Sequence, residues 1–446
     1  MDAPHRTEAA CLLEQGALYR RRIGLEPVTA PGEPIFCGLK PGAFSLYFGD
    51  APIYHFDLDG RWQRAFVSGT HYLKGLDATT QVIDRLREGP NLVLKRHTLD
   101  IAQANDFDAR VRTTAWELLH DLGAGRLRRR EPPAEKAQPL GNDELCQILE
   151  RISEWDAAAW LAHRQRYRET YGQFPFLPPE CQSAVVLQAT LGHAGGRSFG
   201  LGPVTGHQVR TRTEFEQHAR EVAALWGRRL LQSRVIFLAG SDLLHQPPHD
   251  IAADLHAIGR HFPIEAARAV AQGRPEPEEA APRLDGIHVF LDDFRPPLPD
   301  RAAWREFASR GLIRVSLGVE SGDPAVRAIY HKNWSDEELR SAVADLKAAG
   351  LGASLLTLVG AGGIEHAEKH LLETVRLIES LELGRGDFVF LLDENEIRDP
   401  STPVEGMTWL RGSAWSEQQT QLKSALAPLK SRGIKVLPYT MEKQWA

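Results

Sequence analysis

Acidic and histidine side chains follow several apolar runs in the second half of this 446-residue sequence. His193, Asp242, Asp292 and Asp393 each come soon after such a run, and Glu320 follows another directly. Carboxylate and imidazole groups that converge on one place can coordinate a divalent cation. The first four residues are therefore candidate metal ligands. The competing interpretation is that loops at the edge of a sheet are polar for solvation alone.

The apolar runs that precede these residues predict buried parallel strands. Most are short and dominated by Val, Ile, Leu or Phe, as expected for strands covered on both faces. Amphipathic segments at residues 213–226, 250–261 and 335–349 separate some of them. This alternation predicts an α/β fold with a parallel sheet, and six such units predict a (βα)6-type partial TIM barrel. The predicted strands are residues 184–187, 235–239, 287–291, 315–319, 355–359 and 388–392.

The first part of the chain predicts a separate, small α+β domain. Residues 45–48, 53–58, 61–67 and 91–94 have the composition of strands, and residues 108–122 predict a helix. The Asp59-Gly60 pair between two of these strands indicates a hairpin, because glycine accepts the positive φ of such a turn. The predicted organisation is this N-terminal domain (1–122), a linker with a helical lead-in (123–180), the barrel (181–400) and a C-terminal helix and strand extension (401–446). The basic run at residues 128–130 falls in the predicted linker.

Four segments of the barrel region resemble motifs of the radical S-adenosylmethionine (SAM) superfamily. Residues 174–190 read FPFLPPECQSAVVLQAT, and residues 235–242 read VIFLAGSD at the second-strand turn. Residues 318–322 read GVESG at the end of the fourth strand, and residues 359–363 read VGAGG after the fifth. The four motifs occur in the order of the superfamily, one for each of four strands. The resemblance implies a radical SAM-like barrel.

The resemblance also implies a site for SAM or S-adenosylhomocysteine at the carboxyl ends of the strands. The turn after the second strand, with Gly240, Ser241 and Asp242, corresponds to the one that faces the methionyl amine. Glu320 and Ser321 correspond to the motif associated with the ribose, because a carboxylate accepts hydrogen bonds from hydroxyl groups. The two glycines of the turn that admits the adenine end are Gly360 and Gly362.

The loop after the first strand departs from the superfamily. Relatives carry three cysteines there, usually spaced C-x3-C-x2-C, whose thiolates ligate a [4Fe–4S] cluster. Residues 191–202 read LGHAGGRSFGLG and contain no cysteine. With Phe199 as the anchor, the ligand positions hold His193, Arg197 and Gly200. A spacing one residue longer would use His193, Ser198 and Leu201, and neither register supplies a thiolate. The chain is thus identified as a degenerate member whose own cluster is expected to be absent.

Composition excludes some classes of protein. Four cysteines lie far apart with no C-x-x-C pair, at Cys11, Cys37, Cys146 and Cys181, so neither a disulfide scaffold nor a dense metal site is indicated. The net charge of −6 gives no sign of nucleic-acid binding. No uncharged apolar run approaches the roughly 18 residues that a membrane span needs, and a reducing cytoplasm is the expected location.

Three functions remain open from the sequence. The leading hypothesis is a pseudoenzyme that acts as partner, sensor or scaffold, such as beside an intact radical SAM enzyme, and that retains a site for SAM or a related nucleoside. The second is a cluster-independent, metal-dependent enzyme that uses the acidic mouth of the barrel. The third is a radical SAM enzyme whose cluster is completed by another chain.

Overall fold

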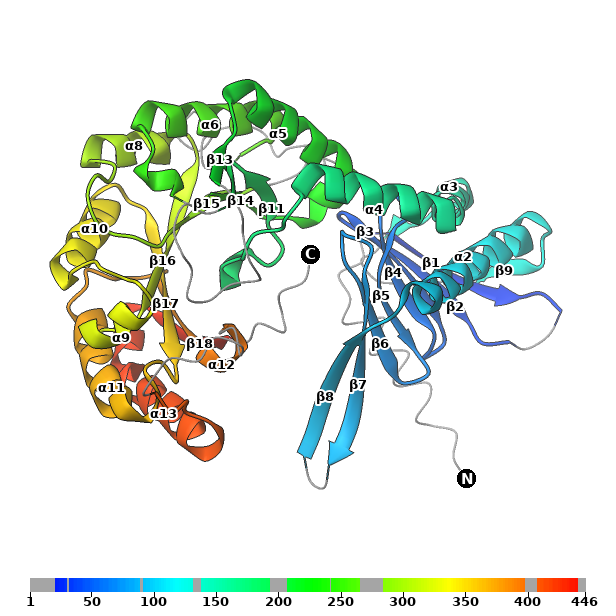
Figure 1. Cartoon of the computed structure of the whole chain (residues 1–446). Helices are drawn as coiled ribbons and strands as arrows, with labels where there is room; N and C mark the ends of the chain where they lie inside the picture. Colours follow the sequence, from blue (N-terminus) through cyan, green and yellow to red (C-terminus); the bar gives the residue numbers. More distant parts are fainter. Residues whose placement is uncertain are drawn as a thin grey trace.

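The computed structural model describes residues 21–29, 32–88, 91–130, 138–192, 207–240, 242–264, 284–397 and 407–439. They form two units, an antiparallel β-sheet with helices on it and a parallel α/β sheet (Figure 1). The fold class predicted from the sequence, a parallel α/β unit preceded by a smaller unit, is confirmed.

The N-terminal unit is built on a sheet that is antiparallel except at β10. Its strand order is β10-β1-β2-β3-β4-β5-β6-β7-β8, and β9 pairs with β1 beside this path. Hairpins join neighbouring strands, as expected when short turns connect a meander. The strands are β1 (Arg21–Pro27), β2 (Ile35–Lys40), β3 (Ala43–Phe48), β4 (Ile53–Asp57), β5 (Trp62–Val67), β6 (Thr70–Lys74), β7 (Thr80–Glu88), β8 (Asn91–Thr98), β9 (Leu127–Arg130) and β10 (Gln138–Pro139).

Three described helices come after β8 in the chain: α2 (Ile101–Gly123), α3 (Asn142–Ser153) and α4 (Ala157–Tyr171), with β9 and β10 between α2 and α3. Asp100 begins α2 with a capping box, accepting from the backbone of Gln103 while the Gln103 side chain accepts from the backbone of Asp100. Phe107 on α2 and Ile148 on α3 share one apolar core with Phe44 of the sheet. The core of the N-terminal unit therefore includes residues well beyond position 122.

The segment predicted as a linker takes part in the sheet, which corrects that prediction. Arg128 to Arg130 lie in β9, which pairs antiparallel with β1, and β10 pairs parallel with β1. The arginines are exposed, as expected for a strand at the edge of a sheet. Their charge concealed the strand in the sequence, because edge strands lack the apolar signal of buried ones.

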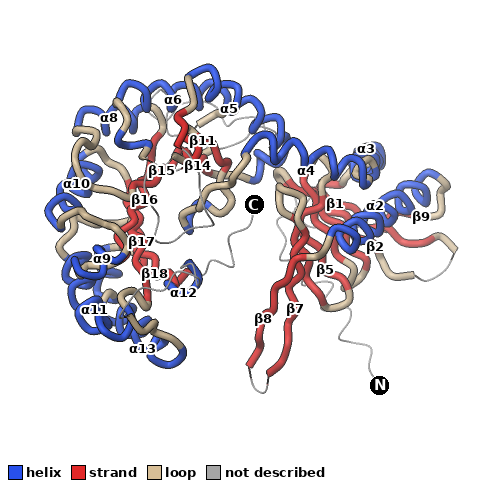
Figure 2. The backbone as a smooth tube through the Cα atoms, in the orientation of Figure 1, coloured by secondary structure: helices blue, strands red, loops and turns tan. Residues whose placement is uncertain are grey.

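The second unit contains a seven-stranded parallel sheet with the order β11-β14-β15-β16-β17-β18-β19. The strands curve into an arch, with helices on its convex side (Figures 1 and 2). Each of the six predicted strands is present. They are β11 (Val185–Gln188), β14 (Val235–Ala239), β15 (Gly286–Leu291), β16 (Leu312–Glu320), β17 (Gly352–Val359) and β18 (Phe388–Asp393), and β12 (Thr190–Gly192) with β13 (His207–Val209) forms a separate small ladder.

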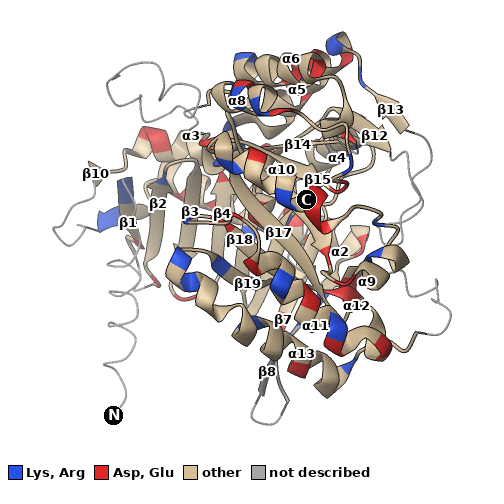
Figure 3. Cartoon of the chain, turned by 90° about the vertical axis from the view of Figure 1, so that its left-hand side faces the viewer, with Lys and Arg blue, Asp and Glu red and all other residues tan. Residues whose placement is uncertain are grey.

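Amphipathic helices cover the outside of this sheet. Their apolar faces join the strands in one large core, and Lys, Arg, Asp and Glu are interspersed on α10, α11 and α13 (Figure 3). None of the described helices has the length and apolar composition to cross a bilayer. The helices are α5 (Arg212–Trp226), α6 (Pro248–His261), α8 (Arg301–Ser309), α9 (Pro324–Ile329), α10 (Asp336–Ala348), α11 (Gly363–Glu379), α12 (Glu394–Ile397) and α13 (Gly412–Ala425), with 3₁₀ turns η1 (Pro179–Cys181), η2 (Gly227–Gln232), η3 (Leu243–His245) and η4 (Ala427–Arg432).

The parallel sheet does not end near residue 400, where the sequence predicted the end of the barrel. A seventh strand, β19 (Lys435–Tyr439), pairs parallel with β18. The sequence predicted a strand in the C-terminal extension but not that it joins this sheet. Its sequence, KVLPY, contains a lysine and a proline, which are tolerated at the edge of a sheet. The side chains of Val436 and Tyr439 are nevertheless buried.

The predicted Asp59-Gly60 hairpin joins the two units. Arg61, at the end of this turn, is buried, and its guanidinium donates to the carbonyl oxygens of Leu225 (2.7 Å) and Trp226 (2.5 Å) in the parallel unit. The same guanidinium pairs with Asp57 at 2.6 Å. These buried bonds fix the hairpin against the carboxyl end of α5.

Candidate functional site

Four predicted site positions lie at one edge of the parallel sheet. Since neighbouring strands all run parallel, their carboxyl ends meet at the same edge. Gly240 follows β14, Glu320 ends β16, Gly360 follows β17 and Asp393 ends β18. The prediction that Gly240, Glu320 and Gly360 share one mouth is confirmed.

The turn after β14 lies against the exit of the first strand. A Cβ atom on Gly240 would be 3.0 Å from Leu243 Cβ and 3.2 Å from Thr190 Oγ1, so a side chain there would crowd both. Asp242 follows in the left-handed conformation, with φ of 56°, and begins η3. Ser241, the other predicted cofactor contact of this turn, lies outside the described residues.

Glu320 belongs to a cluster of three charged residues, here called the Lys332 cluster, with Asp292 and Lys332. The Lys332 ammonium forms a short ion pair with Asp292 Oδ1 and lies 3.3 Å from Glu320 Oε1. It also donates to the main-chain carbonyl of Asp292 at 3.2 Å. The side chains of Lys332 and Glu320 are 8% and 6% exposed, while that of Asp292 is 45% exposed. One ammonium therefore serves two carboxylates, one buried and one at the surface.

This arrangement shifts the ionisation of the buried pair. Burial raises the pKa of Glu320 to about 8, with Lys332 opposing the shift and Asp292 adding to it. Burial also opposes charge on Lys332, but the two carboxylates outweigh it and raise the pKa of Lys332. Lys332 therefore pairs as a cation foremost with Asp292, and burial favours the neutral form of Glu320. Glu320 Oε2 is buried and has no hydrogen-bond partner among the described residues.

The turn after Glu320 is fastened to α11 through Ser321. His370 Nε2 lies 3.0 Å from the carbonyl oxygen of Leu358, to which it must donate, so His370 Nδ1 accepts from the Ser321 hydroxyl at 2.7 Å. The Ser321 oxygen also accepts from the backbone of Asp323 at 3.0 Å. Burial lowers the pKa of His370 to about 4, consistent with a neutral ring. Ser321 is fully buried in this contact, so its side chain supports the turn next to Glu320.

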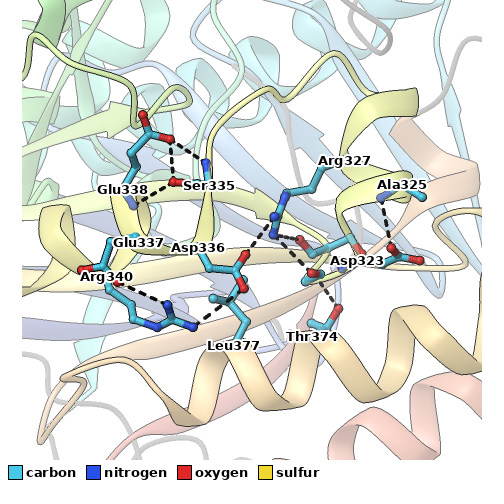
Figure 4. A network of polar contacts seen from close by, with 12 residues as sticks. Asp323, Ala325, Arg327, Ser335, Asp336, Glu337, Glu338, Arg340, Thr374 and Leu377 are labelled. Carbon is cyan, nitrogen blue, oxygen red and sulfur yellow. Dashed lines mark hydrogen bonds and ion pairs between the residues drawn. The ribbon is translucent and has the colours of Figure 1, made fainter.

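A buried arginine holds the other side of the same turn. Figure 4 shows Arg327 between the turn and Asp336. Its guanidinium donates to the carbonyl oxygen of Gly322 at 3.2 Å, pairs with Asp336 at 2.8 Å and lies 4.2 Å from the centroid of Trp334. The backbone N–H of Gly322 donates to Thr374 Oγ1 at 2.8 Å. Both faces of the turn are thereby fixed, which positions Glu320 at the mouth.

The close packing of this turn predicts a severe effect for Gly322→Ala. A Cβ atom at position 322 would overlap the carbonyl group of Glu373 in α11, and backbone cannot move as a side-chain tip can. We expect a loss of about 3 kcal/mol in the free energy of unfolding, measured by urea denaturation. Gly259→Ala is the matched control, since Gly259 lies on α6 with nothing within 4 Å of the added Cβ. The control should be neutral or stabilising, and equal losses in both variants would contradict the packing argument.

The turn after β17 contains Gly360 and Gly362 and packs against the helices α9, α11 and α13. Gly360 has φ of 93°, and its N–H donates to Gln418 Oε1 on α13 at 2.7 Å. A Cβ atom there would lie 3.3 Å from Trp415 Cδ1, and one on Gly362 would collide with Val326 and His366. Backbone conformation and packing thus account for both glycines. Contact with an adenine remains a prediction.

The candidate metal ligands do not form a metal-binding group in the described part of the chain. No set of three or more His, Cys, Asp or Glu side chains there is close enough to hold an ion. Asp292 is already paired with Lys332, and Asp393 accepts from the backbone and side chain of Asn395 at 2.9 and 3.1 Å. His193 lies outside the described residues.

The described cysteines all lie away from the carboxyl edge of the parallel sheet. Cys37 is in β2 and Cys146 in α3 of the N-terminal unit. Cys181 precedes β11, at the amino end of the strand, where its sulfur lies 3.3 Å from His288 Nδ1. Burial raises the pKa of the Cys37 and Cys181 thiols, so both are poor thiolate donors.

The sequence interpretation missed Lys332 and Arg327. Both follow the GVESG motif, in a segment that reads RAIYHKNW over residues 327–334. The available signal was a pair of cations just after the acidic motif, but sequence alone gives no means to decide that they fold back onto it. Trp334, in the same segment, is buried against Phe294 with ring centroids 4.9 Å apart.

No family model and no curated protein matches this chain. Among solved structures, it is similar to methylornithine synthase, with 11% identity over 57% of this chain and 70% of that one, at a TM-score of 0.36. Coproporphyrinogen III oxidase from Escherichia coli, a radical SAM enzyme, aligns with 13% identity over 60% of this chain and 56% of its own, at 0.35. SuiB from Streptococcus suis, bound to SAM, aligns with 8% identity over 84% and 72%, at 0.37.

One of these matches, the coproporphyrinogen oxidase, is described as a radical SAM enzyme. The chain spans little more than half of the coproporphyrinogen oxidase. Because the identities lie between 8% and 13% and the TM-scores below 0.5, we draw nothing from these matches about family, ligands or chemistry.

Proposed function

We propose that this chain is a radical SAM-like pseudoenzyme. In this proposal it holds no [4Fe–4S] cluster, binds SAM or S-adenosylhomocysteine by the nucleoside end, and acts in the cytoplasm as a partner, sensor or scaffold, such as beside an intact radical SAM enzyme. The observation that carries the proposal is which ligand-binding groups the chain has at the expected positions. The loop at residues 191–202 offers no thiolate, while Glu320 remains at the end of β16.

The residues present do not fit an iron–sulfur cluster. Three thiolates are needed to hold three irons, and the described cysteines lie in β2, in α3 and before β11. In the superfamily, the open iron of the cluster holds the methionyl amine and carboxylate of SAM. A chain without the cluster lacks that anchor, so binding would rest on nucleoside contacts.

The end of β16 does fit a hydroxyl-bearing ligand. Glu320 Oε2 is a buried polar atom without a hydrogen-bond partner in the described residues, which costs free energy unless a ligand or water satisfies it. In its neutral form, which burial favours, Glu320 can both donate to and accept from a ribose hydroxyl. Ser321, Gly322 and Arg327 fix the backbone that carries it. These contacts support a preformed site.

Titration calorimetry with SAM and with S-adenosylhomocysteine tests the retained site. We expect binding in the high-micromolar range, weakened by about 2 kcal/mol, or roughly thirty-fold, in Glu320→Ala. Glu337→Ala is the control, because the Glu337 side chain is 83% exposed on α10. No heat from the wild type at millimolar ligand would end the proposal of a retained site. Equal affinity in Glu320→Ala would show that Glu320 does not contact the ribose.

A further inference from the structure

A cavity of about 230 Å³ lies in the N-terminal half of the chain, away from the carboxyl edge of the parallel sheet. It opens to the surface and is bordered by the turn before β7 and the start of that strand, the first turn of α2 with the residue Leu99 before it, and one face of α4. This volume is suited to a small organic molecule, because an apolar cavity of about 150 Å³ already admits benzene. We refer to it as the α4 cavity.

Three polar residues of α4 line this cavity on one helical face. Arg164, Tyr167 and Arg168 are spaced i, i+3 and i+4, so their side chains are neighbours. Tyr167 is 6% exposed, and its hydroxyl has no hydrogen-bond partner among the described residues. Arg164 donates to the carbonyl oxygen of Ala78 at 3.1 Å, but its Nε is buried without a partner there. Arg168 is exposed and makes no side-chain ion pair within the described ranges. This face of α4 therefore presents hydrogen-bond donors that have no acceptor among the described residues.

A carboxylate lines the same cavity. Asp77 Oδ1 accepts from the backbone N–H and the hydroxyl of Thr79, both at 2.8 Å. Neither Arg164 nor Arg168 comes within ion-pair distance of Asp77 in the described structure, although all three line one small space. Charges of both signs therefore face the cavity without neutralising each other. A purely anionic ligand would be opposed by Asp77, and a purely cationic one by the two arginines.

The remaining wall is apolar. Leu99 and Ala104 contribute to it, and Ile101 at the rim is 65% exposed, which is unusual for a large aliphatic side chain beside a cavity. A ligand with a short hydrocarbon group would cover this surface. The hydrophobic contribution is modest for so small an area, so the charged groups decide orientation.

We propose that the α4 cavity binds a small α-amino acid with an apolar side chain in its zwitterionic form. The carboxylate of the ligand lies toward Arg164 and Arg168, its ammonium group toward Asp77, and its side chain against Leu99 and Ile101. A zwitterion bound in this way gives the two guanidinium groups an anion and the Asp77 carboxylate a cation. The proposal does not depend on the function proposed for the parallel sheet.

The test uses the full chain and three matched probes in saturation-transfer NMR titrations. L-leucine carries both charges, 4-methylpentanoate lacks the ammonium group, and 3-methylbutylamine lacks the carboxylate. We expect saturable binding of leucine and at least about ten-fold weaker binding of each analogue, because each leaves one charged group of the cavity unpaired. No saturable leucine signal at 20 mM, or equal binding of either analogue, would overturn the proposal.

Variants then place the binding in the cavity. Arg168→Gln removes an exposed guanidinium from the rim, and Arg166→Gln makes the same charge change on an exposed residue of α4 that does not line the cavity. Leucine binding should weaken about ten-fold in Arg168→Gln and stay unchanged in Arg166→Gln. Because both sites are exposed, both variants should fold, as circular dichroism would show. Equal effects of the two substitutions would assign the binding to general surface charge and overturn the proposed site.

Discussion

The purified chain, reconstituted anaerobically with iron and sulfide, is expected to hold no iron–sulfur cluster after gel filtration. The broad absorbance near ~400 nm that thiolate-ligated clusters give should be absent. The reason is chemical, since a single imidazole at His193 cannot replace three thiolates, and neither Arg197 nor Gly200 supplies a thiolate. Buried Cys37 and Cys181 lie elsewhere, and burial raises their pKa.

A triple variant, His193→Cys, Arg197→Cys and Gly200→Cys, is the matched control for this experiment. It restores the C-x3-C-x2-C spacing in the loop at residues 191–202 and leaves the rest of the chain unchanged. Iron and sulfide bound by the variant alone would trace the loss to the missing thiolates. Roughly four irons and four sulfides per wild-type chain would contradict the pseudoenzyme proposal. Iron bound only after a second protein is added would support a cluster completed by another chain.

The parts of the fold that the sequence predicted are those with a strong local pattern. Six of the parallel strands are nearly continuous apolar runs, because helices cover one of their faces and side chains fill the other. Among the features that were missed, β9 had been assigned to a linker, and β19 had been placed in an extension outside the parallel sheet; both lie at sheet edges and carry arginine, lysine or proline. At an edge, solvent replaces one neighbour, so the composition no longer marks a strand.

The positions of the candidate site that lie at strand ends were predictable, because the strands themselves were. Gly240, Glu320 and Gly360 share an edge because topology alone brings the ends of parallel strands together. The Lys332 cluster was not predictable, because it depends on how the segment after α9 folds back toward β15 and β16. Tertiary contacts of that kind leave no periodic signal in one sequence.

Glu320→Gln is expected to remove a large pH dependence from the stability of the protein. Burial raises the folded-state pKa of Glu320 to about 8, against 4.5 for an ordinary glutamate. Between these two values the folded chain holds a proton that the unfolded chain releases, so the contribution to stability is full below the lower value and is lost as pH rises through the higher one. Glutamine is neutral throughout. From pH 5 to pH 8.5, wild type should therefore lose on the order of 3 kcal/mol of unfolding free energy more than the variant.

Urea denaturation of wild type and Glu320→Gln at pH 5 and pH 8.5 measures this difference. The contributions of groups that titrate alike in the two proteins cancel when the free energies of unfolding are subtracted. Glu337→Gln is the control, because it makes the same chemical change on a side chain of α10 that is 83% exposed. Parallel pH curves for wild type and Glu320→Gln would contradict the argument, since they would mean that Glu320 is ionised in the folded chain across this range. Lys332 would then neutralise Glu320 as well as Asp292. The expected result is that the wild-type free energy of unfolding, plotted against pH, runs parallel to that of Glu320→Gln only below about pH 5 and falls away from it at higher pH. That result would show that one ammonium cannot hold two carboxylates charged when one of them is buried.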